Sequence, residues 1–222
     1  MYSSKRELAI FIDSLPGFKK PKIYLEQYPT DGELVATAVW DAYMRGLLGR
    51  VLDLGCGTGR FAIAAAAMGA RHVVCLDLDI EAIQIAKTAG GGLSIDFVIG
   101  DAAMPPLRER FDVVFQNPPF GIWAGRGADL VFLNSAVGLG GVVYTIHKLA
   151  TLDYVAQWAK RRSLSIEVLE KAVLKIKPSY PHHRKKIHRV EVFLAVVKKK
   201  LRKTIGFEPR LCILYTPAGL IL

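Results

Sequence analysis

Asn117, Pro118, Pro119 and Phe120 form a compact group whose side chains and backbone predict a defined chemistry. The group directly follows the apolar run FDVVFQ. The Asn117 amide and a rigid, proline-flanked carbonyl offer two hydrogen-bond acceptors, and the Phe120 ring offers a flat face for stacking. Two acceptors beside a flat face suit an amino group on a planar ring, such as N6 of adenine.

Such an amine is a poor nucleophile because its lone pair is delocalised into the ring. Two acceptors that hold both N–H groups out of the ring plane would direct the lone pair toward an electrophilic methyl group for in-line displacement. An amide does not titrate, so Asn117 is expected to position the amine and stabilise its developing charge, not to act as a base. Alone, Asn-Pro-Pro could equally just end a strand, because proline cannot continue a ladder.

A glycine-rich turn upstream supplies the context. The stretch VLDLGCGTG at 51–59 is an apolar run that enters a turn before the helix-like FAIAAAAMGA. Glycine permits a tight turn and close approach of a ligand, although such a match alone is a weak signal. Arg60 follows Gly59, so the GK[ST] pattern of a phosphate-binding loop is absent. Asp53 fits a methyltransferase, in which this carboxylate lies near the methionine end of the ligand.

Acidic residues also end the next two apolar runs. HVVCLDLD brings Asp77 to the position where a carboxylate accepts hydrogen bonds from ribose hydroxyls. The following run delivers Asp101, beside Ala102, at a position suited to the adenine amino group of a cofactor. The spacing of Asp77 alone also fits a nucleotide-dependent oxidoreductase. Each aspartate could instead cap a helix, and this is the role predicted for Asp79.

The elements that position these residues are predicted from alternating strand-like and helix-like patterns. They indicate an α/β fold: a Rossmann-like class I methyltransferase with a seven-stranded, mostly parallel sheet, one antiparallel strand at its edge, and helices on both faces. Ligands bind such sheets at the carboxyl ends of the strands, where the motifs above fall. The predicted strands are 50–54, 72–77, 94–99, 111–116, 141–146, 165–176 and 188–199, and the predicted helices are 3–14, 33–48, 59–68, 80–89, 128–138 and 151–161.

The length of 222 residues and a hydrophobic content of 51% suit one large core, and no low-complexity segment divides the chain. We predict an N-terminal helical segment at 1–48 that closes the cofactor site, a catalytic core at 49–199, and a basic and apolar extension at 200–222.

The cysteines and the chain ends bear on location. Cys56, Cys75 and Cys212 are far apart and lack metal-binding spacing, so we expect neither a disulfide framework nor a metal site, and a reducing, intracellular setting. The start MYSSKREL lacks a signal pattern, and the ending is too short and too broken by Pro217 and Gly219 to span a bilayer. A cytosolic protein is expected.

The formal net charge of +10 favours binding to a polyanion. HHRKKIHR at 182–189 lies between the last two predicted strands, at the end of the sheet that carries the Asn-Pro-Pro-Phe group, where cations could bind phosphates beside the target base. A second run, KKKLRK at 198–203, follows the last strand. A solvated basic face is the alternative. The predicted RNA-binding residues are His182, His183, Arg184, Lys185, Lys186 and Arg189.

Taken together, the motifs resemble the methyltransferase-like protein 5 family of ribosomal RNA adenine N6-methyltransferases. The resemblance covers most of the chain and rests on LEQYPT at 25–30, DLGCGTG at 53–59, LDLD at 76–79, NPPFG at 117–121, GADLVFL at 127–133, YTIHK at 144–148 and a basic segment before VEVFL. It implies methylation at N6 of an adenine in small-subunit ribosomal RNA, with S-adenosyl-L-methionine as the donor and Asn117 to Phe120 around the flipped base. The cofactor-binding residues would be Gln27, Tyr28, Thr30, Asp53, Gly55, Gly57, Thr58, Gly59, Arg60, Asp77, Asp101 and Ala102.

The resemblance also implies a partner, because family members pair with a small zinc-binding activator protein that covers an apolar edge of the sheet. The strand SIDFVIG is the candidate edge here. Two departures from the family pattern stand out. The family usually has an aromatic residue at the position of His182, so a second ring over the adenine would be this imidazole or Tyr180, and the stretch from about Lys200 extends past the usual family end.

Two other functions fit parts of the sequence. A methyltransferase acting on guanine N2, cytosine N4, DNA adenine or a glutamine side chain would use the same Asn-Pro-Pro-Phe geometry, although the positive charge argues against a peptide substrate. An inactive RNA-binding or assembly factor could retain the fold. The intact acidic residues and the intact NPPF sequence weigh against this second alternative.

Overall fold

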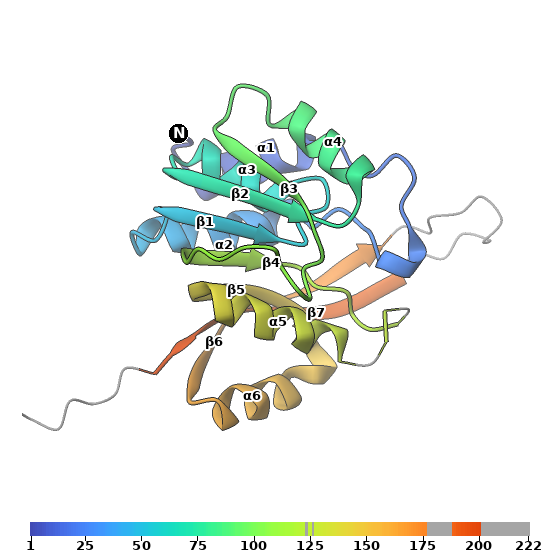
Figure 1. The fold of residues 1–222 in the computed structure, drawn as a ribbon, viewed down its shortest axis with the longest axis vertical. Helices are drawn as coiled ribbons and strands as arrows, with labels where there is room; N and C mark the ends of the chain where they lie inside the picture. Colours follow the sequence, from blue (N-terminus) through green and yellow to red (C-terminus); the bar gives the residue numbers. More distant parts are fainter. Residues whose placement is uncertain (123, 126, 177–187, 201–222) are drawn as a thin grey trace, which may run out of the picture.

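A computed structural model shows the fold (Figure 1) and describes residues 1–122, 124, 125, 127–176 and 188–200. Its centre is one seven-stranded sheet with the order β3-β2-β1-β4-β5-β7-β6. The predicted sheet is therefore confirmed. The strands are β1 Arg50–Leu54, β2 His72–Asp77, β3 Ile95–Ile99, β4 Phe111–Gln116, β5 Gly140–Lys148, β6 Leu164–Ile176 and β7 His188–Lys199.

The first five strands pair in parallel, whereas β7 runs antiparallel to both β5 and β6. The antiparallel strand is thus the second from the edge and not the edge strand that was predicted, because β6 pairs with β7 on its outer side. β6 and β7 are consecutive in the chain, and antiparallel pairing of consecutive strands needs no crossover connection. Its consequence is that the end of β6 and the start of β7 lie toward the carboxyl end of β5, where Lys148 pairs with Val192.

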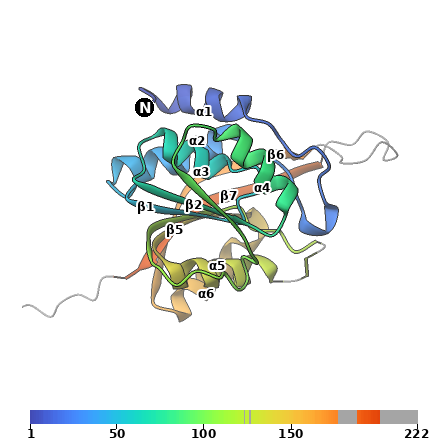
Figure 2. The same cartoon turned by 45° about the horizontal axis from the view of Figure 1, so that its top comes forward.

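Helices cover both faces of the sheet (Figure 2). Strand residues point alternately to the two faces, so Val51, Val73 and Val113 pack in one hydrophobic cluster and Leu52 and Val74 in the other. The first cluster lies under α1 Lys5–Ser14, α2 Gly32–Met44, α3 Arg60–Ala67 and α4 Ile80–Ala89, and the second under α5 Ala128–Leu139 and α6 Leu152–Arg161.

Most predicted element bounds agree with the structure to within a few residues. The largest difference is at α2, which ends at Met44 and not at residue 48. Gly46 adopts the left-handed conformation with φ 69°, and its N–H donates to the Tyr43 carbonyl, which closes the helix. Two short 3-10 helices were not predicted, η1 Ile23–Leu25 and η2 Leu149–Thr151.

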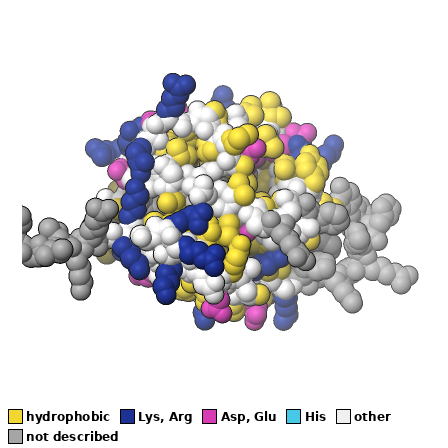
Figure 3. Space-filling view, turned by 60° about the horizontal axis from the view of Figure 1, so that its bottom comes forward, with side chains coloured by type: hydrophobic (Ala, Val, Ile, Leu, Met, Phe, Trp, Pro, Cys, Tyr) yellow, Lys and Arg dark blue, Asp and Glu magenta, His cyan; other side chains and the backbone are white. Residues whose placement is uncertain are grey.

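Basic side chains gather at the amino ends of the parallel strands. The runs Lys160–Arg162 and Lys198–Lys200 meet there, because Leu164 pairs with Lys199 and Val142 pairs with Lys198. Figure 3 shows the face that carries α5 and α6, on which Lys and Arg side chains gather toward one side. This cluster is on the opposite end of the sheet from the Asn-Pro-Pro-Phe group.

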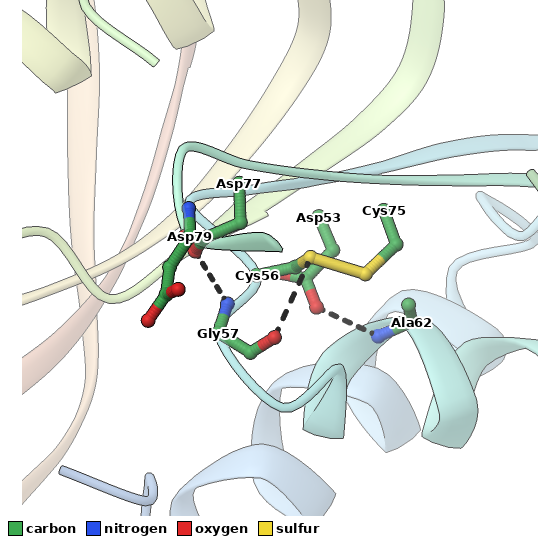
Figure 4. Close-up of a disulfide and its surroundings, with 7 residues drawn as sticks. All are labelled: Asp53, Cys56, Gly57, Ala62, Cys75, Asp77 and Asp79. Atoms are coloured by element: carbon green, nitrogen blue, oxygen red, sulfur yellow. Dashed lines mark hydrogen bonds between the residues drawn. A yellow bond between two sulfur atoms is a disulfide. The ribbon is translucent and has the colours of Figure 1, made fainter. Parts of the chain in front are cut away.

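Cys56 and Cys75 form a disulfide, with their Cα atoms 5.6 Å apart (Figure 4). The prediction that the cysteines form no disulfide is therefore wrong. Cys56 follows β1 and Cys75 lies in β2, and the parallel pairing of these strands brings together residues 19 positions apart. Sequence motifs such as CxxC cannot indicate a contact of this kind. The prediction of a reducing, intracellular setting rested on the expected absence of a disulfide, so the cysteines no longer support it.

The proposed division of the chain at residues 48 and 199 stays a prediction. The N-terminal segment packs on the core through α1 and α2, which contribute Leu8, Ile12 and Leu34 to the first hydrophobic cluster. Residues 201–222, including Cys212, lie outside the described residues. Within the part of the chain that is described, no helix combines the length and apolar character that a membrane crossing requires.

Candidate active site

The glycine-rich turn joins β1 to α3 in a conformation that requires glycine. Gly55 and Gly57 have φ values of 72° and 54°, in the left-handed region. A Cβ atom at Gly55 would approach the Phe132 ring to 3.0 Å, and one at Gly57 would approach the Phe18 ring to 2.7 Å. The N–H groups of Gly55 and Cys56 both donate to the Leu76 carbonyl, which fixes the turn beside the end of β2.

Two aspartates at the ends of β1 and β2 accept hydrogen bonds from the backbone around this turn (Figure 4). Asp53 is 1% exposed, and its Oδ2 accepts a hydrogen bond of 2.9 Å from the Ala62 N–H in the first turn of α3. Burial raises the pKa of Asp53 to about 8, and the neighbouring Asp77 carboxylate adds to this rise. Asp77 accepts hydrogen bonds from the N–H groups of Gly57 (2.7 Å) and Asp79 (2.8 Å), and burial raises its pKa too.

Asp79 caps α4, as predicted, because its side chain accepts the Glu81 N–H at 3.0 Å. The same carboxylate accepts hydrogen bonds from the Lys22 ammonium and from the Gln27 amide nitrogen at 2.7 Å. The Gln27 amide oxygen in turn accepts the Lys22 N–H. The side chain of Gln27 therefore ties the N-terminal segment to the loop after β2.

The Asn-Pro-Pro-Phe corner begins directly after β4 and contacts the N-terminal segment. The Tyr28 hydroxyl donates to Asn117 Oδ1 at 3.0 Å, and Asn117 Nδ2 donates to Thr30 Oγ1 at 3.1 Å. The Glu26 carboxylate accepts the Phe120 N–H at 2.6 Å. The rings of Tyr28 and Phe120 lie 5.8 Å apart, centre to centre. Segments far apart in sequence thus meet at this corner.

A cavity of about 200 Å³ joins the glycine-rich turn to the Asn-Pro-Pro corner. It lies at the carboxyl ends of β1, β2 and β4, where ligands bind in doubly wound sheets. Of the predicted catalytic and cofactor-binding residues, Gly59, Pro118 and Phe120 are not among those that line it. The predicted residues that line it are Gln27, Tyr28, Thr30, Asp53, Gly55, Gly57, Thr58, Arg60, Asp77, Asp101, Ala102, Asn117 and Pro119.

Some of the predicted cofactor-binding residues also form hydrogen bonds within the protein. Arg60 is buried, and its guanidinium donates to the carbonyls of Thr30 (2.9 Å) and Leu15 (3.1 Å). These hydrogen bonds hold the N-terminal segment against α3. Gly59, which does not line the cavity, is the left-handed N-cap of α3. Asp101 is exposed and accepts the Ala103 N–H at 2.8 Å. The binding roles assigned to these residues stay a prediction.

A chain of buried polar side chains lies behind the corner and was not predicted from the sequence. Gln116 Nε2 donates to Thr145 Oγ1 at 3.0 Å, the Thr145 oxygen lies 2.8 Å from His147 Nε2, and His147 Nδ1 lies 3.0 Å from the Asp129 carboxylate. Gln116, Thr145 and His147 are fully buried. The chain links β4, β5 and α5 immediately beside Asn117. The only hint in YTIHK is that alternate residues of a strand share a face.

Cations also border the corner. Lys148 ends β5 with its ammonium 5.7 Å from the centre of the Phe120 ring. Lys175 pairs with Arg189 at the same end of the sheet, where β6 ends and β7 begins. The register therefore places the end of β6 and the start of β7 at the end of the sheet that carries the Asn-Pro-Pro-Phe corner. The predicted RNA-binding residues other than Arg189 lie outside the described residues; they are His182, His183, Arg184, Lys185 and Lys186.

Comparison with known proteins identifies relatives over nearly the whole chain. Residues 51–132 match a family model described as a methyltransferase domain. The Danio rerio protein named rRNA N(6)-adenosine-methyltransferase METTL5 is 31% identical, over 84% of this chain and 95% of that protein. The uncharacterized protein MJ0284 of Methanocaldococcus jannaschii is 33% identical, over 92% and 96%. The crystal structure of PH1948 from Pyrococcus horikoshii, a candidate RNA methyltransferase, is 33% identical with a TM-score of 0.79, over 90% and 99%.

Proposed function

The chain belongs to the methyltransferase-like protein 5 family, and we propose that it transfers a methyl group from S-adenosyl-L-methionine to N6 of an adenine in small-subunit ribosomal RNA. The observation that carries this proposal is that the glycine-rich turn and Asn117 line the same cavity. Donor and acceptor can meet only where such a cavity joins their two binding motifs. The choice of a ribosomal RNA adenine as the substrate rests on the names of the animal relatives, which are rRNA N(6)-adenosine-methyltransferases.

The corner suits the acceptor amine. Asn117 Oδ1 and the Pro118 carbonyl are the two acceptors for the N–H groups of the adenine, and Phe120 is the stacking face. An amide oxygen has two lone pairs, so the hydrogen bond from Tyr28 leaves one for the amine. These acceptors hold the lone pair of the amine on the line of transfer and stabilise the positive charge that develops on nitrogen.

The cavity also suits the cofactor, which supplies a methyl group on a positively charged sulfur. Gly55 and Gly57 line the cavity without side chains, which allows close approach of a ligand to the backbone. Asp53 faces the cavity as a buried carboxyl group whose raised pKa would fall beside a cation. In this proposal Asp77 holds the ribose hydroxyls, Asp101 and Ala102 hold the adenine, and Gln27, Thr58, Gly59 and Arg60 shape the surrounding loops.

Ribosomal RNA is the proposed substrate because of the charge as well as the family. The net charge is +10, and Lys148, Lys175 and Arg189 lie at the catalytic end of the sheet. Cations at this end can bind phosphates next to the target base. The base must leave its stack to reach Asn117, at a cost of a few kcal/mol, so an unpaired or looped adenine is the favoured target.

A small zinc-binding activator is the proposed protein partner, and the cytoplasm is the proposed setting. The partner's place is the free edge of β3, the terminal strand of the sheet. Ile99 in β3 is 54% exposed, and Met104 just beyond it is 80% exposed, so a protein that adds a strand here would bury apolar surface. Co-expression of this chain with such an activator should yield a complex that an Ile99→Asp variant fails to form.

The methylation itself is tested by mass spectrometry of nucleosides from the small-subunit ribosomal RNA of a strain that lacks this protein. N6-methyladenosine should be missing at one position, and the purified protein with S-adenosyl-L-methionine should restore it. A loss of N2-methylguanosine or N4-methylcytidine instead would assign the same site to a different amine. An unchanged set of methylated nucleosides would overturn the proposal.

A further inference from the structure

Three side chains of the N-terminal segment contact the Asn-Pro-Pro-Phe corner. Glu26, Tyr28 and Thr30 alternate along the chain, and each forms a hydrogen bond with residues 117–124. The sequence resemblance assigned Tyr28 and Thr30 to the cofactor and gave Glu26 no role. Their hydrogen bonds are instead made to the residues that receive the methyl acceptor in the proposed function.

The Glu26 carboxylate holds the backbone of the corner. One of its oxygens accepts the Phe120 N–H at 2.6 Å, and the other accepts the Ala124 N–H at 3.2 Å. Glu26 itself has φ 53°, a left-handed conformation that is uncommon for a residue with a side chain. Such strain persists where surrounding contacts enforce it, and it is frequent at functional sites. The carboxylate therefore fixes the backbone position from which the Phe120 side chain extends.

Tyr28 and Thr30 hold the side chain of Asn117 from both ends of its amide. The Tyr28 hydroxyl donates to Oδ1 and the Thr30 oxygen accepts from Nδ2, at 3.0 and 3.1 Å. Burial raises the pKa of Tyr28 well above its usual range, so the phenol stays protonated and available as a donor. A protonated phenol facing Oδ1 favours the amide orientation in which this oxygen, and not the NH₂ group, meets a donor.

The other side of the same segment is tied to the cofactor loops. Gln27 donates to Asp79 after β2, and Arg60 of α3 donates to the Thr30 carbonyl. The segment thus joins the loops after β1 and β2 to the corner after β4. It spans the two halves of the cavity, and a rigid connection of this kind fixes the distance between donor and acceptor sites.

We propose that Glu26, Tyr28 and Thr30 are positioning residues for the transfer step, which hold the Asn117 amide and the Phe120 backbone in the geometry that receives the target amine. This inference rests on the proposed function. Loss of a positioning residue should lower kcat by about tenfold to a hundredfold. The affinity for the cofactor should stay within about twofold of the wild-type value, because these side chains form their hydrogen bonds with the corner and not with the glycine-rich turn.

The kinetic test compares variants that remove one hydroxyl at a time. Tyr28→Phe and Thr30→Val should lower kcat for rRNA methylation, whereas Thr30→Ser keeps the acceptor oxygen and should restore most of it. Tyr154→Phe on α6 and Thr88→Val on α4 are matched controls away from the site and should match the wild type. Calorimetry with S-adenosyl-L-methionine measures the cofactor affinity of each variant. Equal kcat in all variants, or a loss of cofactor affinity in place of kcat, would overturn the positioning role.

A second readout does not need turnover. The backbone N–H groups of Phe120 and Ala124 should exchange with solvent at least about tenfold faster in Glu26→Ala than in the wild type, since their acceptor is removed. Glu33→Ala on α2 is the control. A wild-type protein that methylates no ribosomal RNA would overturn the proposed function, and the exchange rates would then decide separately whether Glu26 holds the corner. Unchanged exchange in Glu26→Ala would show that it does not.

Discussion

The ammonium of Lys148 lies 5.7 Å from the centre of the Phe120 ring, at the carboxyl end of β5. Among the residues that the structure describes, Lys148 forms no ion pair within 4.0 Å. Since Phe120 is the proposed stacking face for the target adenine, we expect the ammonium to lie near the bound nucleotide. A cation at this position would hold the extruded nucleotide by its backbone.

Replacement of Lys148 by Gln should therefore weaken binding to small-subunit ribosomal RNA. The slope of log affinity against log salt concentration should become shallower by about one, as expected for one lost phosphate contact. Lys148→Arg should preserve the slope. Lys160→Gln, in the basic cluster at the opposite end of the sheet, is the matched control. Filter binding across a salt series measures the slopes, and equal slopes for wild type and Lys148→Gln would remove Lys148 from the RNA-binding site.

Asn117→Ala should abolish methylation and leave cofactor affinity nearly unchanged. The lost amide oxygen contacts the target amine in the proposed mechanism, and removal of one such preorganised group typically costs a factor of about 10² to 10³ in kcat. Single-turnover methylation of ribosomal RNA measures the rate, and calorimetry measures binding of S-adenosyl-L-methionine. Asn134→Ala on α5 is a control for the substitution. A rate close to that of the wild type would contradict the proposed role of Asn117.

Asp77→Ala should weaken cofactor binding before it affects the chemical step. The Asp77 carboxylate accepts the N–H groups of Gly57 and Asp79, so its loss also loosens the glycine-rich turn. Hydrogen bonds to a charged group contribute about 1.5–3 kcal/mol, so the dissociation constant should rise by about tenfold to a hundredfold. Calorimetry measures this rise. The assignment of Asp77 to the ribose would fail if kcat fell while the dissociation constant stayed the same.

The fold was predictable from sequence because its determinants are local. Apolar runs of strand length alternate with helical patterns, and each polar residue at the end of a run, such as Asp53, Asp77 or Asn117, marks the carboxyl end of a strand. Parallel strands place these ends along one edge of the sheet. The cap role of Asp79 was also predictable, because it depends on the residues that directly follow it.

The parts that the sequence could not predict depend on contacts between distant residues. Tyr28 and Asn117 are 89 positions apart, and Gln27 and Asp79 are 52 apart, so no spacing rule connects them. The cofactor role assigned to Tyr28 came from the resemblance, which names residues near a ligand but not the atoms that each contacts. The disulfide was missed for the same reason, since strand pairing and not sequence spacing brings Cys56 to Cys75.

The disulfide should stabilise the protein measurably. The bond joins residues 19 positions apart and so restricts the unfolded chain. Reduction of the disulfide should therefore lower the free energy of unfolding by about 3 kcal/mol. Urea unfolding with and without reductant, in a Cys212→Ser background, measures the difference. Cys56→Ala should show the same free energy of unfolding in both conditions. If the Cys212→Ser protein is also insensitive to reductant, the two cysteines contribute no stabilising bond.

The protonation of Asp53 should make stability depend on pH. Burial raises its pKa in the folded protein to about 8, far above its ordinary value of 3.8. The folded state therefore binds more protons than the unfolded state between these two values, so this contribution to stability is full below about pH 4 and is lost as the pH rises toward 8. Its slope cannot exceed about 1.4 kcal/mol per pH unit.

Asp53→Asn removes this titration, so the free energy of unfolding should fall less steeply between pH 5 and pH 8. The pH dependence that remains comes from the neighbouring Asp77, whose pKa is also raised by burial. Urea unfolding at several pH values in this window measures the slope. Asp153→Asn, at the start of α6, should run parallel to the wild type. Added S-adenosyl-L-methionine should reduce the wild-type slope, because a cation beside Asp53 lowers its pKa and releases the proton on binding. Parallel wild-type and Asp53→Asn curves would show that Asp53 is already ionised in the folded protein.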